Sequence, residues 1–210
     1  MLIAFEGIDG SSKTTQIRLL HEYLDKESID NVVTSEPTEG ATGKLIRRIL
    51  KKGKPFDVTA MQLLFTADRA YHVNYFIKEW DSAGKFVLCD RYIFSTLAYG
   101  SASGLNRQWL YKINEQFPLP DMTIVLDISP RLAMKRIHSR MEEYIKNPQL
   151  IGSDTRKSKV SLYEKLGFLS KIRLIYKDMA SEYRNYFIVD SSASQGEVHD
   201  RIVSIIESNI

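Results

Sequence analysis

The sequence predicts an α/β protein in which about five parallel strands are covered by helices on both faces, in three layers. Short apolar runs rich in β-branched residues alternate along the chain with longer segments of helical period. This alternation indicates βαβ units, because parallel strands need long crossover connections. With 210 residues, 43% of them hydrophobic and 26% charged, the chain has the size and composition of a globular domain. We therefore expect residues 1–210 to form a single domain.

The expected strands are short. Residues 2–5 are apolar at every position, which is typical of a strand buried on both faces of a sheet. The other strands are expected at residues 31–34, 85–90, 122–127 and 186–190. Helices are expected between them, among others at residues 15–27, 59–80 and 167–183. A last helix has a recognisable start, because Ser194 followed by Glu197 forms a capping box.

The charge balance and the single cysteine limit the possible partners and compartment. Lys and Arg total 29 against 26 for Asp and Glu, a net charge of +3. This small excess permits an anionic ligand but does not argue for a nucleic-acid or membrane surface. Cys89 is the only cysteine, which excludes an internal disulfide and fits a reducing compartment. With no leader-like segment and no apolar run of membrane-spanning length, we expect a soluble, cytoplasmic protein.

One stretch, residues 131–171, differs from the rest of the chain. It is rich in Arg and Lys, and Pro148, Gly152 and Ser153 interrupt it near its middle. This pattern is typical of two helices joined by a mobile polar loop, so we predict a lid at about residues 136–162. A solvated helical hairpin with ordinary surface charge is the alternative.

The most informative motif directly follows the first strand. Residues 7–14 match the phosphate-binding pattern G-x-x-x-x-G-K-[ST] at every fixed position except Ser12. A strand, a tight loop and a helix start in this order aim backbone N–H groups at phosphate oxygens. The residues expected to bind ATP in this P-loop are Gly7, Ile8, Asp9, Gly10, Ser11, Ser12, Lys13, Thr14 and Thr15.

Individual positions near this loop predict specific chemistry. Lys13 brings a positive charge to the outer phosphates, and Thr14 offers a hydroxyl to Mg²⁺. Ser12 replaces a glycine, and keeping the glycine's left-handed backbone would strain it by about 1 kcal/mol. Asp90 ends a buried strand, where a carboxylate can hold the hydration shell of the same Mg²⁺. Arg91 follows it and can reach phosphates.

The sequence gives little support for catalysis by a histidine-bound metal, by a Ser-His-Asp triad or by a cysteine nucleophile. The four histidines are scattered along the chain, which argues against a His-ligated metal and against Ser-His-Asp catalysis. Cys89 is expected to be a small buried hydrophobic residue rather than a nucleophile.

An ordered set of motifs over nearly the whole chain resembles the thymidylate kinase family, within the P-loop nucleoside monophosphate kinases. The matching segments are Phe5–Gly10 with Lys13–Gln16, Ser35–Pro37 with Gly43–Arg47, Leu63–Arg69, Asp90–Tyr99 and Pro120–Asp127. The resemblance implies a P-loop NTPase-type fold with a helical lid. It also implies transfer of the γ-phosphoryl group of ATP to dTMP, giving dTDP and ADP, with Mg²⁺ as cofactor.

For the acceptor nucleotide, the resemblance implies one group of contacts. Asp9 would accept a hydrogen bond from the 3′-hydroxyl, Phe65 would stack on thymine and Arg69 would donate to a base carbonyl. Positions 65 and 69 share a helix face, which agrees with these roles, although core packing is the alternative for Phe65. Tyr99 would disfavour a 2′-hydroxyl. The full implied set is Asp9, Pro37, Arg47, Phe65, Arg69, Arg91, Thr96 and Tyr99.

The same resemblance assigns the groups that meet the phosphates and the donor base. Lys13 and Arg91 would stabilise the migrating phosphoryl group, and Arg47 would bind a phosphate. Ser191 and Ala193, after the last strand, would lie near the adenine of ATP.

The lid is expected to supply a further cation. Gly10 stands where some family members carry a P-loop arginine, and members with glycine there take the arginine from the lid. Arg136 and Arg140, one helical turn apart, are the expected pair of catalytic lid residues, with Arg156 as a further candidate. The arginine usual in the family before an aromatic-Glu pair is replaced by Leu162.

Departures from the family pattern leave alternatives open. Ser35 stands where many members have arginine, and Gly100 where bacterial members often have a glutamine that reads thymine. These departures allow a broader or different base preference. Ser12 allows a catalytically weakened nucleotide-binding module. The resemblance also implies a homodimer, with the aromatic-rich residues 71–80 as one candidate surface.

Overall fold

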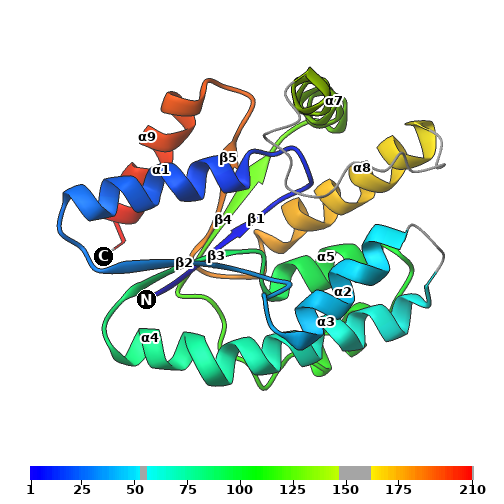
Figure 1. Ribbon diagram of the computed structural model, residues 1–210, viewed down its shortest axis with the longest axis horizontal. Coiled ribbons are helices and arrows are strands. Elements are labelled where there is room, and N and C mark those ends of the chain that lie inside the picture. Colours follow the sequence, from blue (N-terminus) through cyan, green and yellow to red (C-terminus); the bar gives the residue numbers. More distant parts are fainter. Residues whose placement is uncertain (53–55, 147–161, 210) are drawn as a thin grey trace.

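The computed structural model describes residues 1–52, 56–146 and 162–209 (Figure 1). At its centre is a parallel sheet in the order β2-β3-β1-β4-β5. Its strands are β1 (Leu2–Glu6), β2 (Asn31–Ser35), β3 (Phe86–Asp90), β4 (Met122–Asp127) and β5 (Tyr186–Asp190). The prediction of five parallel strands is confirmed, and every boundary falls within one residue of the expected one.

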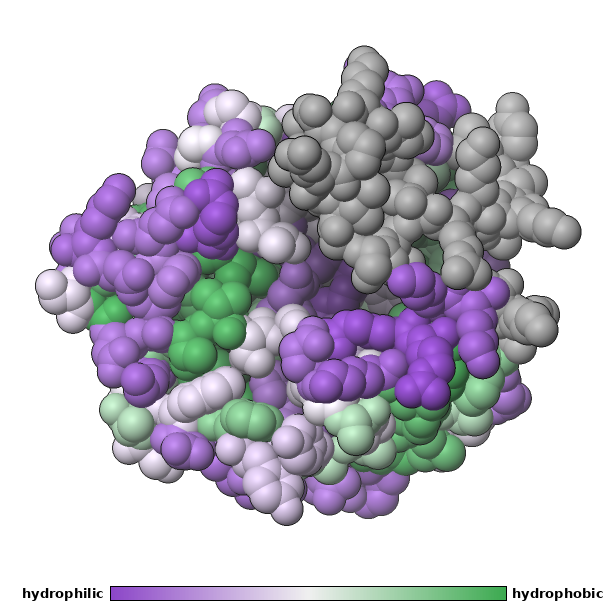
Figure 2. All heavy atoms as spheres, viewed as in Figure 1, coloured by the Kyte–Doolittle hydropathy of each residue, from purple (hydrophilic) through white to green (hydrophobic). Residues whose placement is uncertain are grey.

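Helices cover both faces of the sheet, so the expected three-layer arrangement is confirmed (Figure 1). They are α1 (Lys13–Lys26), α2 (Ala41–Lys52), α3 (Val58–His72), the π-helical segment η1 (Val73–Ile77), α4 (Lys78–Ser82), α5 (Ile93–Ala102), α6 (Arg107–Lys112), α7 (Pro130–Lys146), α8 (Leu162–Met179) and α9 (Gln195–Glu207). Among the described residues, no helix has the length and apolar character needed to cross a membrane. In the space-filling view, the face shown is hollowed near its centre, with hydrophilic residues in the hollow and hydrophobic residues along one side of it (Figure 2).

Alternate side chains of β1 supply the two cores of the protein. Ile3 and Phe5 pack in one core with residues of α1 and α9. Leu2 and Ala4 pack in the other core, with residues of η1, α5 and α8. The strand is buried along its whole length, as its uninterrupted apolar sequence predicts.

Two helices differ from their predicted form. The helix expected at residues 59–80 is interrupted by the π-helical segment Val73–Ile77, for which the side-chain period gives no signal. The helix expected to end at Tyr183 ends at Met179, so that boundary is wrong. The Tyr183 ring instead packs edge-on against Phe94, with ring centres 4.7 Å apart. This tertiary contact lies beyond what local periodicity can report.

The predicted lid falls partly outside the described residues. Helices α7 and α8 flank it, in agreement with the two helices expected in this stretch. Residues 147–161, which include Arg156, lie outside the description, as does the side chain of Arg140. The function of this insertion as a lid stays a prediction.

The capping box at the start of α9 gives a stability prediction. The Ser194 hydroxyl accepts a hydrogen bond from the Glu197 N–H (3.3 Å), and the Glu197 carboxylate accepts one from the Ser194 N–H (3.0 Å). Ser194→Ala should therefore lower the free energy of unfolding, measured in urea, by about 1 kcal/mol. Ser204→Ala on the same helix is the control, because the Ser204 hydroxyl is exposed and only donates to the Asp200 carbonyl. Equal effects of the two substitutions would contradict the capping role.

Candidate active site

The predicted P-loop connects β1 to α1 at the carboxyl edge of the sheet. Gly7 and Gly10 have φ of 132° and 83°, and a Cβ on Gly10 would lie 2.5 Å from the Ala133 carbonyl oxygen. Ser12 has φ of 71°, so it keeps the left-handed conformation expected of the glycine it replaces. Ser11 is fully buried, whereas Asp9 at the tip of the loop is exposed.

The cation from α7 lies directly beside this loop. Arg136 donates from Nη1 to the Ser12 hydroxyl (3.2 Å) and from Nη2 to the Ser191 carbonyl (2.9 Å). It thereby joins the P-loop to the segment after β5, where Ser191 and Ala193 lie. The backbone of α7 leaves no room for a side chain at Gly10, so a P-loop arginine could not occupy this position without a shift of the helix.

Lys13 is buried over the P-loop. Its Nζ donates to the carbonyl oxygens of Gly7 (3.1 Å) and Ile8 (3.2 Å). Burial and, to a smaller extent, the positive charge of nearby Arg91 lower the pKa of Lys13 to about 8. A polyphosphate bound by the loop would favour the charged lysine again.

The candidate metal-binding pair lies at the start of α1 and the end of β3. The Thr14 hydroxyl donates to Asp90 Oδ2 (3.2 Å), and Asp90 Oδ1 is buried without a partner. An unpaired carboxylate oxygen beside a hydroxyl fits Mg²⁺ or its bound water. The described part of the chain holds no cluster of three or more His, Cys, Asp or Glu suited to a metal.

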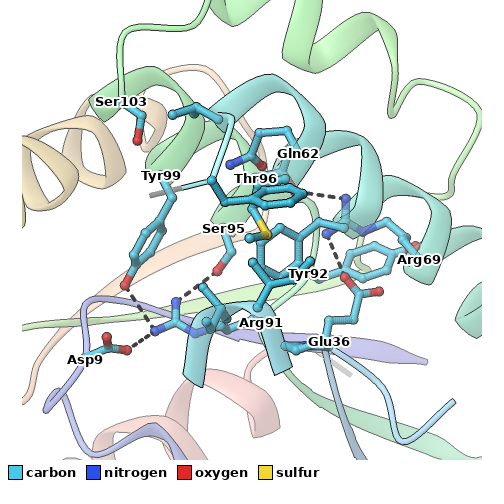
Figure 3. Close-up of a pocket in the computed structure, with 17 residues that line it drawn as sticks. Asp9, Glu36, Gln62, Arg69, Arg91, Tyr92, Ser95, Thr96, Tyr99 and Ser103 are labelled. Atoms are coloured by element: carbon cyan, nitrogen blue, oxygen red, sulfur yellow. Dashed lines mark hydrogen bonds and ion pairs between the residues drawn. The ribbon is translucent and has the colours of Figure 1, made fainter. Parts of the chain in front are cut away.

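Arg91 connects the P-loop with α5 (Figure 3). Its guanidinium donates to Asp9 Oδ1 (2.6 Å), the Gly7 carbonyl (3.2 Å), Ser95 Oγ (3.1 Å) and the Tyr99 hydroxyl (3.1 Å). Its central carbon also lies 5.0 Å from the centre of the Tyr99 ring. Arg91 has φ of 69°, a left-handed conformation that turns the chain from β3 into α5. One cation thus contacts residues predicted for both nucleotides.

The buried carboxylate of Glu6 holds the start of α5, on which the contacts of Arg91 depend. Glu6, the last residue of β1, is fully buried and accepts hydrogen bonds from the N–H groups of Tyr92 (2.9 Å) and Ser95 (3.0 Å). It also accepts from the hydroxyls of Ser95 (2.6 Å) and Tyr176 (2.8 Å). Burial raises the pKa of Glu6, while these donors oppose the rise. Glu6 therefore caps the first turn of α5 and orients Arg91 through Ser95.

A pocket of about 470 Å³ opens beside Arg91 (Figure 3). Its lining includes the predicted acceptor residues Asp9, Pro37, Phe65, Arg69, Arg91, Thr96 and Tyr99. The structure therefore brings together all members of that predicted set except Arg47.

Arg69 is anchored at the inner end of this pocket. It is 1% exposed, and it donates to Glu36 (2.6 Å), Asn114 (2.5 Å) and Thr96 (3.2 Å). The second oxygen of Glu36 contacts the ring of His72 at 3.1 Å. A buried arginine with these partners is pre-organised, because every one of them is itself held in the core.

Arg47 lies elsewhere. Its guanidinium donates to the carbonyl oxygens of Pro37 (2.6 Å) and Thr38, and it pairs with Glu39 at 2.7 Å. It thus holds the turn that precedes α2. The phosphate contact of Arg47 stays a prediction.

Sequence reasoning missed several residues of the site. Glu6 carried a signal, since it is a charged residue at the end of an otherwise apolar strand. Ser95 and Glu36 lie within quoted motifs but had no assigned role. Asn114 and Tyr176 join the site only through tertiary contacts, and no local pattern marks them.

The lowered pKa of Lys13 predicts a pH-dependent affinity for nucleotide. At pH 9 most of the free protein has neutral Lys13, so Lys13 must take up a proton from solvent when the nucleotide binds. At pH 7 most of the free protein already carries this proton. The Kd for a non-hydrolysable ATP analogue with Mg²⁺ should therefore be roughly tenfold higher at pH 9 than at pH 7. Lys13→Arg should flatten this dependence, because arginine stays charged. Equal Kd values at both pH values in the wild type would contradict the assignment.

Comparison with known proteins agrees with this geometry. A family model described as thymidylate kinase matches residues 5–202. The chain is 36% identical over 214 residues to a probable thymidylate kinase of Pyrococcus abyssi, covering 99% of this chain and 96% of the relative. It is 38% identical over 218 residues to a probable thymidylate kinase of Thermococcus onnurineus, covering 100% and 98%. It is also 38% identical over 210 residues to probable thymidylate kinase 1 of Saccharolobus solfataricus, covering 100% and 98%. The chain belongs to the thymidylate kinase family.

Proposed function

We propose that this protein is an ATP-dependent dTMP kinase, which transfers the γ-phosphoryl group of ATP to dTMP and gives dTDP and ADP. Family membership supports this function. The observation that carries it is Arg91, whose guanidinium contacts both the P-loop and the side chains around the acceptor pocket. A cation in this place can neutralise charge on donor and acceptor together.

The proposed chemistry is a direct displacement. An oxygen of the dTMP phosphate attacks the γ-phosphorus of ATP, and the bond from that phosphorus to the oxygen that ADP retains breaks. The attacking oxygen is already anionic at neutral pH, so no strong general base is required. The protein contributes position and charge, from Lys13, Arg91 and Arg136 in the described part of the chain.

On the donor side, we assign ATP to the P-loop residues 7–15 and to Ser191 and Ala193 after β5. Thr14 and Asp90 are the proposed ligands of Mg²⁺ or of its water shell. When bound, this ion would neutralise phosphate charge. The alternative of a catalytically weakened nucleotide-binding module depends on Ser12. The left-handed backbone of Ser12 argues against this alternative, because the loop keeps the shape that phosphate binding needs.

On the acceptor side, Phe65 and Arg69 are assigned to the base, and Asp9 and Tyr99 to the sugar. The Tyr99 hydroxyl is held by Arg91 at 3.1 Å, which supports its assignment as the ring that disfavours a 2′-hydroxyl. Arg91 is assigned to the phosphate. A broader base preference remains the second candidate within the same reaction, because of Ser35 and Gly100.

We further propose that the protein is a cytoplasmic homodimer. Leu45 on α2 and Leu63 on α3 are 39% and 48% exposed, and with Phe56 they line one apolar hollow between these helices. Tyr71 and Tyr75 of the predicted aromatic surface are also exposed and contact each other, with ring centres 5.0 Å apart. Solvent-exposed apolar faces of this kind support association with a second copy. Light scattering measures the mass in solution.

An acceptor panel tests the proposed function. With ATP and Mg²⁺, the wild type should form dTDP from dTMP faster than it phosphorylates dCMP, dGMP or dAMP. Chelation of Mg²⁺ with EDTA should abolish turnover. Lys13→Ala, Arg91→Ala and Arg136→Ala should each lower kcat by about 100-fold or more, because each removes a charge that stabilises the transferring group.

Arg131→Ala is the matched control, since Arg131 is exposed on the same helix as Arg136 and has no predicted contact with nucleotide. It should leave kcat unchanged. Arg140→Ala measures the contribution of the second predicted lid arginine. Full activity of the Lys13 and Arg91 variants, or ATP binding without turnover on any acceptor, would contradict the proposal.

A further inference from the structure

One buried amide in the acceptor pocket has no partner in the structure. Gln62 on α3 is 5% exposed, lines the pocket, and buries its amide oxygen Oε1 without a hydrogen bond. Its backbone carbonyl accepts from the Thr66 hydroxyl (2.9 Å), so the unpartnered acceptor is Oε1 of the side chain. Buried polar groups without partners are rare, because they lose their hydrogen bonds to water and gain nothing in return. A ligand in the pocket can supply the missing bond once the amide turns Oε1 towards it.

Gln62 lies on the helix face that is assigned to the base. It is three residues before Phe65 and seven before Arg69, so the three side chains follow one stripe of α3. Thr96 of α5 faces the same space and accepts from Arg69 at 3.2 Å (Figure 3). The amide therefore lines the same pocket as the ring of Phe65 and the guanidinium of Arg69.

Position 100, where a glutamine would be expected to read the base, does not face this space. A Cβ on Gly100 would lie 2.7 Å from Leu110 Cδ1, so Gly100 allows α5 to pack closely on α6. Gly100 is absent from the pocket lining, and a glutamine there would displace the Leu110 side chain. The amide available in the described pocket comes from α3 instead of α5.

We propose that Gln62 is a specificity-determining residue that reads the base edge of the acceptor nucleotide, an inference that rests on the proposed function. Thymine presents an N3–H donor next to a carbonyl acceptor. Rotation about the terminal torsion of Gln62, which is broad, brings Oε1 to the cavity to accept from N3–H. Arg69 donates to the adjacent carbonyl.

Arg69 makes this reading directional. Glu36 and Asn114 hold its guanidinium, which has only donors, so the group opposite must be an acceptor. Cytosine places an amino group there, so the contact with Arg69 would be lost, and it has no hydrogen on N3, so Oε1 of Gln62 would find no donor there. Uracil has the same N3–H and carbonyls as thymine. Gln62 thus selects pyrimidines with an N3–H edge and is indifferent to the 5-methyl group.

A matched pair of acceptors isolates this edge. dTMP and 5-methyl-dCMP carry the same methyl group, sugar and phosphate, and differ only at N3 and C4. The wild type should prefer dTMP in kcat/KM, and Gln62→Met should reduce this preference by about tenfold or more. The ratio of kcat/KM for dTMP to that for dUMP should not change. This constancy distinguishes the loss of one base contact from a general structural defect of the pocket.

Two further variants control the experiment. Gln16→Met replaces another buried glutamine with an unpaired Oε1, which lies outside the pocket lining, and should keep the preference for dTMP. Gln62→Glu retains an acceptor for N3–H and should also keep it, which makes the proposal testable if Gln62→Met fails to fold. Circular dichroism checks the fold of each variant.

The outcomes separate the two proposals. A Gln62→Met enzyme that retains the full preference, or a Gln62→Glu enzyme that loses it, would overturn the role of Gln62 and leave the kinase activity intact. Equal kcat/KM of the wild type for 5-methyl-dCMP and dTMP would also overturn the role of Gln62 and leave the kinase activity intact. A wild type inactive on both acceptors would overturn the proposed function and, with it, this inference.

Discussion

The geometry of this site depends on one buried carboxylate, that of Glu6. A charge removed from water costs several kcal/mol, so it is retained only where hydrogen bonds compensate for the lost hydration. Glu6 gains these bonds from Tyr92 and Ser95 at the start of α5 and from Tyr176 of α8. β1, the start of α5 and α8 thus meet at a single group. Arg91 is linked to Glu6 through the Ser95 hydroxyl, to which its guanidinium donates a hydrogen bond.

A second buried charge has the same effect in the acceptor pocket. Glu36 pairs with Arg69 at 2.6 Å and contacts His72 at 3.1 Å, with all three side chains buried. Two arginines, Arg91 and Arg69, are therefore held in place by side chains of the protein itself. Such pre-organisation reduces the reorganisation that binding or catalysis would otherwise require. The net charge of +3 conceals this local concentration of cations.

Much of the fold could be predicted because its determinants are local. Apolar runs marked the strands, the glycine and Lys-Thr pattern marked the P-loop, and Ser194 with Glu197 marked the start of α9. The resemblance placed Phe65 and Arg69 in one pocket. Partners distant in sequence could not be inferred, such as Asn114 for Arg69. The position of Arg47 depends on carbonyl oxygens of a turn, which residue identity does not encode.

The central claim is that Glu6 orients Arg91 through the Ser95 hydroxyl. The most direct measurement is the single-turnover rate of phosphoryl transfer with both nucleotides saturating, in Ser95→Ala and in Ser101→Ala. Ser101 lies on the same helix, and its buried hydroxyl has no partner among the described residues. The account predicts a rate about tenfold lower for Ser95→Ala and unchanged for Ser101→Ala. Equal rates in the two variants and the wild type would contradict it.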